Sequence, residues 1–262
     1  MKLMVNHQTH YQYSEIASNS IQYIKMMPQT DGHQRVHSWD FSIPGQYTTQ
    51  KDAFDNFWVT STQRYPYQQL TIMVQGIVEI DPHCDVSMQK RALHPSIFLQ
   101  PTAMTMCNRE MLAFAHDYVK HMTRAEFQNL AAAVLNYIPY QPQVTEVHTA
   151  AIDVFKAHQL GGVCQDHSHV FIAMCRGLGV PARYVSGYLY APNLLHLASH
   201  AWVEVYLEKM WYCFDISNQI FTPHSHIYVA IGRDYYDVAP VRGIRERGGV
   251  ETMHSVVQVL PC

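Results

Sequence analysis

The spacing of apolar residues changes along this chain, and the change constrains the fold more than any single motif does. Residues 1–80 alternate in short runs, of which the clearest are 20–26, 36–43, 57–63 and 70–80. Runs of period two separated by turn residues are typical of half-buried strands. Several short strands at this spacing predict an N-terminal β-sandwich.

Helical and strand patterns follow one another in the rest of the chain. Apolar residues recur at helical spacing over 109–120, 124–137 and 149–159, and a fourth helix is predicted to begin at or near Cys164. Strands are predicted over 183–190, 199–207, 211–215, 227–231 and 255–260. Residues 81–102 contain three prolines and no clear period, which indicates a connection between domains. We therefore predict an α+β protein with a β-sandwich domain at 1–95 and a second domain at 96–262.

The composition excludes several classes of protein. Among 262 residues, 18 Lys and Arg against 21 Asp and Glu give a net charge of −3, without the basic excess of a nucleic-acid-binding protein. No apolar run reaches the ~18 residues that span a bilayer, and the first ten residues lack the apolar segment of a signal peptide. The six cysteines include no CxxC pair. We therefore expect a cytoplasmic protein with free thiols and with neither a nucleic-acid nor a membrane partner.

One cysteine lies in a setting that favours reactivity. Cys164 follows Gly161 and Gly162 and opens the predicted fourth helix. Unpaired backbone N–H groups at a helix N-terminus favour the thiolate and can also stabilise an oxyanion. A free cysteine is more often a small buried apolar side chain. The glycine turn and the downstream residues described next make Cys164 a candidate nucleophile.

A histidine and an aspartate lie on neighbouring predicted strands. His200 opens one strand and Asp215 closes the next. If Tyr206 faces Trp211 across a short hairpin loop, His200 and Asp215 are diagonal neighbours on one face, within reach of an imidazole–carboxylate contact. A shift of one residue would turn Asp215 to the other face, and Asn218 would then be the next candidate to orient the imidazole. Cysteine, base and orienting acid in this order form a nucleophilic site.

Other polar residues receive structural interpretations. Asp166 is expected to accept N–H groups at the helix start, and His169 to pack rather than react. Tyr140 is considered as an oxyanion donor, although covering the core is the favoured role. His224 and His226 are a weak metal-binding pair. Because the sequence has no HExxH, zinc-finger or glycine-rich nucleotide motif, we expect no metal and no cofactor.

Several segments resemble those of bacterial transglutaminase-like proteins. They are 161–169, 178–188, 199–206, 214–215, 229–235 and 237–243, and the N-terminal part is similar to the β-domain that precedes the core in that family. The resemblance extends over nearly the whole chain. It implies a papain-like core of helices packed on an antiparallel sheet, in which Cys164, His200 and Asp215 are nucleophile, base and orienting acid.

Three positions depart from the pattern of that family. His167 stands where an aromatic residue is usual, so the pocket is expected to be more polar. Ile216 and Ser217 replace the usual proline and threonine, and the loop at 207–210 lacks the usual proline and glycines. None of these departures removes one of the three candidate catalytic groups.

Together these observations predict a transglutaminase-like cysteine protease or amidase. It would hydrolyse amide bonds of a peptide or protein substrate through an acyl-enzyme on Cys164. Two alternatives stay open: transfer to an amine, which makes an isopeptide, and a catalytically idle peptide-binding scaffold that uses the β-domain as its interaction surface. The sequence does not decide between water and an amine as acceptor, and it leaves the oligomeric state open.

Overall fold

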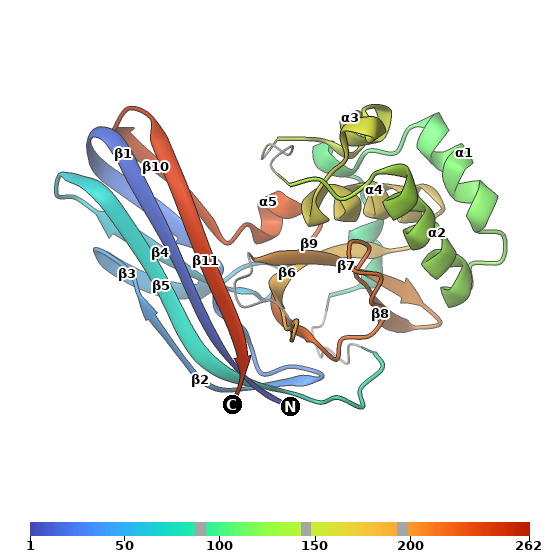
Figure 1. Ribbon diagram of the computed structural model, residues 1–262, viewed down its shortest axis with the longest axis horizontal. Coiled ribbons are helices and arrows are strands. Elements are labelled where there is room, and N and C mark those ends of the chain that lie inside the picture. The colour runs from blue at the N-terminus through green and yellow to red at the C-terminus, as the bar shows by residue number, and fades with distance from the viewer. Residues whose placement is uncertain (87–92, 143–147, 193–198) are drawn as a thin grey trace.

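The computed structural model of the protein describes residues 1–86, 93–142, 148–192 and 199–262. A long bent sheet lies on one side of the molecule, and helices packed on a smaller sheet lie on the other (Figure 1). The mixed α/β character predicted from the sequence is confirmed. Among the described residues, no helix has the length and apolar character needed to cross a membrane.

The large sheet has seven strands, all connected through its first one. They are β1 (Lys2–Ile24), β2 (Gln34–Ser42), β3 (Gln46–Lys51), β4 (Phe57–Gln63), β5 (Tyr67–Ile80), β10 (Val241–Arg247) and β11 (Glu251–Pro261). Along one side of β1 run β4 and β5, and along its other side run β10 and β11. The two chain ends therefore lie side by side (Figure 1).

This arrangement differs from the predicted sandwich of two separate sheets. Because β1 is 23 residues long, one strand pairs with four others and the sheet bends instead of dividing. The last two strands also join this sheet, although they belong to the range 96–262 that was assigned to the second domain. The boundary near residue 95 stays a prediction, but the N-terminal sheet is built from both ends of the chain.

The second layer contains the helices and a four-stranded antiparallel sheet. The helices are α1 (Arg109–Tyr118), α2 (Arg124–Tyr137), α3 (Ala151–Lys156), α4 (Cys164–Gly177) and α5 (Tyr235–Val238). The sheet has the order β8-β7-β6-β9, with β6 (Ala182–Leu189), β7 (His200–Leu207), β8 (Met210–Phe214) and β9 (His226–Gly232). Helix α4 is buried from Asp166 to Arg176 and packs on the sheet (Figure 1). It is the central element of the hydrophobic core between the helices and this sheet.

The hairpin between β7 and β8 has the predicted register, with Tyr206 opposite Trp211. Its two loop residues both have positive φ, 51° at Glu208 and 67° at Lys209. Such a turn matches the twist of paired strands but usually contains Asn or Gly. The burial of most of β7, and of Cys213 and Phe214 in β8, therefore favours this register in spite of poor turn residues.

Candidate active site

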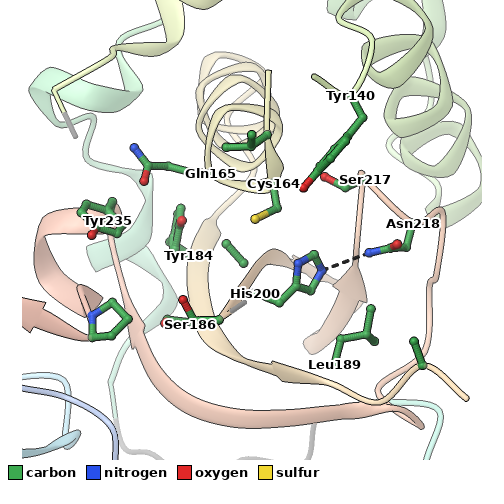
Figure 2. A pocket seen from close by; sticks show the side chains of 15 residues that line it. Tyr140, Cys164, Gln165, Tyr184, Ser186, Leu189, His200, Ser217, Asn218 and Tyr235 are labelled. Atoms are coloured by element: carbon green, nitrogen blue, oxygen red, sulfur yellow. Dashed lines mark hydrogen bonds between the residues drawn. The ribbon is translucent and has the colours of Figure 1, made fainter. Parts of the chain in front are cut away.

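The start of α4 is held in place by its own first turn and by the two glycines before it. Gly161 has φ of 77°, and a Cβ on Gly162 would lie 2.9 Å from the Cβ of Asp166. Asp166 accepts the N–H of Val163 at 2.8 Å, which is the structural role expected for it. Cys164 is thus the first residue of α4, with its sulfur facing the pocket in Figure 2.

His200 and Asp215 are hydrogen-bonded neighbours, as the hairpin register predicted. Nε2 of His200 lies 2.7 Å from Oδ2 of Asp215. The Asp215 side chain is fully buried, whereas His200 keeps 12% of its side chain exposed. Figure 2 places the His200 ring between Cys164 and Asn218. The structure therefore brings the three predicted site residues to one place.

The electrostatics of the pair favour a charged imidazole. Burial alone lowers the pKa of His200, but the charge of Asp215 and hydrogen bonds to Asp215 and Cys164 outweigh it and raise this pKa to about 10. Burial raises the pKa of Asp215, and the charge and hydrogen bond of His200 outweigh that effect and lower it. The pair is consequently an imidazolium and a carboxylate at neutral pH.

Two further residues bind the Asp215 carboxylate. The backbone N–H of Asn218 donates to Oδ1 at 3.1 Å, and its side-chain amide nitrogen lies 2.9 Å from Oδ2. The same amide nitrogen lies 3.2 Å from Nε2 of His200, the contact drawn in Figure 2. His226, at the start of β9, has Nε2 3.1 Å from Oδ2. The sequence suggests His226 only as a weak metal ligand paired with His224, but His224 lies 3.5 Å from Asp85 instead. His226 and Asp215 are 11 positions apart, and no periodic pattern in the sequence predicts that they lie side by side.

His200, Asp215 and His226 also place three possible metal ligand atoms within 4.8 Å of one another. Zinc ligands at about 2.0–2.1 Å in tetrahedral geometry would be ~3.3 Å apart. The separation of 2.7 Å between His200 and Asp215 is instead that of a charge-assisted hydrogen bond. The donor set therefore fits a hydrogen-bonded cluster better than a zinc site.

The pocket over Cys164 has a volume of about 620 Å³. Apart from Cys164 and His200, its described lining side chains are aromatic, aliphatic or neutral polar, and none of them is Asp, Glu, Lys or Arg. Tyr140, Tyr184, Ser186 and Gln165 surround the sulfur in Figure 2. Tyr140 is 51% exposed, with its hydroxyl pointing into the pocket. The pocket suits an uncharged stretch of substrate.

Two of the residues that depart from the family pattern, His167 and Ser217, contact each other. His167 does not make the pocket more polar, because it is fully buried. Its Nε2 donates to the carbonyl of Ile138 at 2.8 Å, so Nδ1 accepts the Ser217 hydroxyl at 2.8 Å. His169 is also buried and accepts the backbone N–H of Tyr235, in keeping with its expected packing role. Burial lowers the pKa of both imidazoles.

Comparison with known proteins gives the family. A model of the bacterial transglutaminase-like N-terminal region matches residues 3–79, and a model of the transglutaminase-like superfamily core matches residues 113–216. An uncharacterized protein of Mycobacterium leprae is 29% identical over 279 residues, covering 98% of either chain. One of Mycobacterium tuberculosis is 27% identical, covering 92% of this chain and 86% of its own.

A solved structure shares the fold. The crystal structure of a cysteine protease candidate from Cytophaga hutchinsonii matches with a TM-score of 0.79 and 20% identity, covering 100% of this chain and 91% of that one. The chain is therefore a member of the transglutaminase-like superfamily, with a bacterial transglutaminase-like N-terminal region in front of a transglutaminase-like core.

Proposed function

We propose that this protein is a thiol acyl-transfer enzyme that hydrolyses peptide or isopeptide amide bonds, with Cys164 as nucleophile, His200 as base and Asp215 as orienting acid. One observation carries the proposal. A thiol at a helix N-terminus faces a pocket beside an imidazole whose far nitrogen is 2.7 Å from a buried carboxylate. Such an arrangement activates a thiol and holds its base in one tautomer.

The first half of the reaction forms an acyl-enzyme. The sulfur of the Cys164 thiolate attacks the amide carbon, and the carbonyl π electrons move to oxygen as the C–S bond forms. N–H groups of the first turn of α4, which lack intrahelical partners, stabilise this oxyanion. The C–N bond then breaks, and the His200 imidazolium gives its proton to the leaving amine.

The second half releases the acyl group. Water attacks the thioester carbon while His200 takes the proton of the water. The C–S bond breaks with its electron pair returning to sulfur, and the acid leaves. Asp215 holds the imidazole and stabilises its charged form in both halves. An amine in place of water would give an isopeptide by the same steps.

A substrate screen tests the proposal. Peptide amides with uncharged residues around the amide are incubated with an amine probe, and enzyme and products are examined by mass spectrometry. We expect a thioester on Cys164 and a free acid as product, both lost in Cys164→Ala. Cys107→Ala is the matched control, because Cys107 is also partly buried but lies outside the pocket lining.

Two other outcomes of the substrate screen would identify a different function. Incorporation of the amine probe in preference to water would identify a transglutaminase. Peptide binding with no thioester, unchanged in Cys164→Ala, would identify a scaffold and refute the enzyme proposal.

A further inference from the structure

Strand β9 is the edge of the four-stranded sheet, and side chains of the N-terminal region bind its outer backbone groups. The Gln34 amide donates to the carbonyl of Tyr228 at 2.8 Å and accepts its N–H at 2.7 Å. Asn56 does the same with Ile231, at 2.8 and 2.9 Å. Two amide side chains thus take the place of a fifth strand, and they satisfy groups that an open edge leaves unpaired.

These contacts are part of the core and not a surface feature. Gln34 is 5% exposed and Asn56 is fully buried. His33 adds a third contact, with Nε2 donating to the carbonyl of His226 at 3.0 Å. The position of β9 is therefore fixed from the N-terminal side along its length, from residue 226 to residue 231.

The first residue of β9 reaches the site. The His226 side chain is fully buried and packs on Trp202, with ring centroids 4.7 Å apart. Its Nε2–H donates to Oδ2 of Asp215 at 3.1 Å, the same oxygen that binds His200. Burial lowers the pKa of His226, so the ring stays neutral and supplies a donor without a second charge.

We propose that His226 is a positioning residue for Asp215, and that the N-terminal region completes the site by holding β9 through Gln34 and Asn56. The inference rests on the proposed function, because it concerns the carboxylate assigned there to orient His200. It gives the N-terminal region a role within the active site, in addition to any role as a binding surface. His226 keeps the carboxylate ionised and aimed at the His200 imidazolium.

The test measures the alkylation of Cys164 by iodoacetamide between pH 5 and pH 9, with mass spectrometry of the labelled peptide, in the full-length protein. This assay reads the thiolate–imidazolium pair without a known substrate. His226→Leu removes the donor, whereas His226→Gln keeps a terminal N–H that can reach Asp215. Gln34→Met removes the contact to β9 at constant length. The other titratable groups around Asp215 and His226 are the same in all variants. They are Cys164, Cys213, Tyr140, His33, His167 and His200.

We expect His226→Leu to lower the alkylation rate at pH 6 by about 10-fold or more, the effect of losing one hydrogen bond to a charged group. His226→Gln should recover to within about 3-fold of wild type, and Gln34→Met should fall between the two. His7→Leu is the matched control. It removes a buried imidazole of the N-terminal region that binds Tyr188 and Ser255, away from the pocket, and should alkylate as wild type.

The alkylation rates test the proposed function and the role of His226 separately. If Cys164 of wild type alkylates no faster than Cys107, the proposed function fails and this inference falls with it. If wild type is fast and a folded His226→Leu protein is equally fast, only the inference is overturned. Should His226→Leu not fold, His226→Asn replaces it, because its shorter amide stops before Asp215. Equal rates for His226→Asn and His226→Gln would also overturn the inference.

Discussion

Replacing Asp215 by Asn removes one charge at the centre of the site and keeps the shape of the side chain. Oδ2 of Asp215 faces the side-chain nitrogens of His200, Asn218 and His226, and Oδ1 accepts the backbone N–H of Asn218. An amide cannot accept on both atoms, so its NH₂ group must face a donor in either orientation. The better orientation keeps the oxygen toward His200 and loses the contact to the Asn218 backbone.

The size of the effect follows from the titration of His200. Its pKa rises from the ordinary 6.5 to about 10, with Asp215 the largest of the causes that raise it. A rise of this size corresponds to about 5 kcal/mol of preference for the imidazolium, part of which belongs to Cys164. We therefore expect Asp215→Asn to lower kcat/KM by about 10³–10⁴-fold, the range for loss of an orienting aspartate.

Stability should change with pH in the same variant. Since the folded pKa of His200 is raised, its contribution is complete below pH 6.5 and is lost as pH rises toward 10. The stability difference between wild type and Asp215→Asn should therefore shrink between pH 7 and pH 9, by up to about 1.4 kcal/mol per pH unit. Urea unfolding at several pH values measures it. The reasoning is refuted if the variant keeps more than a tenth of wild-type kcat/KM and the stability difference does not change with pH.

Three further predictions concern stability and are measured by urea unfolding. Burial lowers the pKa of His169 to about 3, so its contribution is lost as pH falls below 6.5; the difference between wild type and His169→Gln should be ~2 kcal/mol larger at pH 7 than at pH 5. Glu204→Gln removes the carboxylate partner of the buried Arg183 and should cost about 3–5 kcal/mol, whereas an effect below ~1 kcal/mol would show that the pair is unimportant. Ser217→Ala takes a hydrogen-bond partner from His167 and should cost about 1–3 kcal/mol, most of which Ser217→Thr restores.

The sequence by itself determined the local parts of the site. The glycine turn and helical spacing placed the start of α4 at Cys164, and the alternation around His200 and Trp211 gave the hairpin register that brings Asp215 to the imidazole. These features depend on residues close together in the chain, where side-chain period and strand length leave few arrangements. The family motifs pointed to the same residues.

Only the tertiary structure decided what surrounds these groups. The sequence predicted a separate N-terminal sandwich, whereas the last strands of the chain pair with β1. It also gave no reason to join His226 to Asp215, or Gln34 and Asn56 to β9 across 194 and 175 positions. Periodicity tells which face of a strand a residue occupies, but not which strand will lie beside it. A polar side chain is expected at the surface, and only the packing of the N-terminal region against β9, and of β9 against Asp215, made these three side chains buried hydrogen-bonding partners.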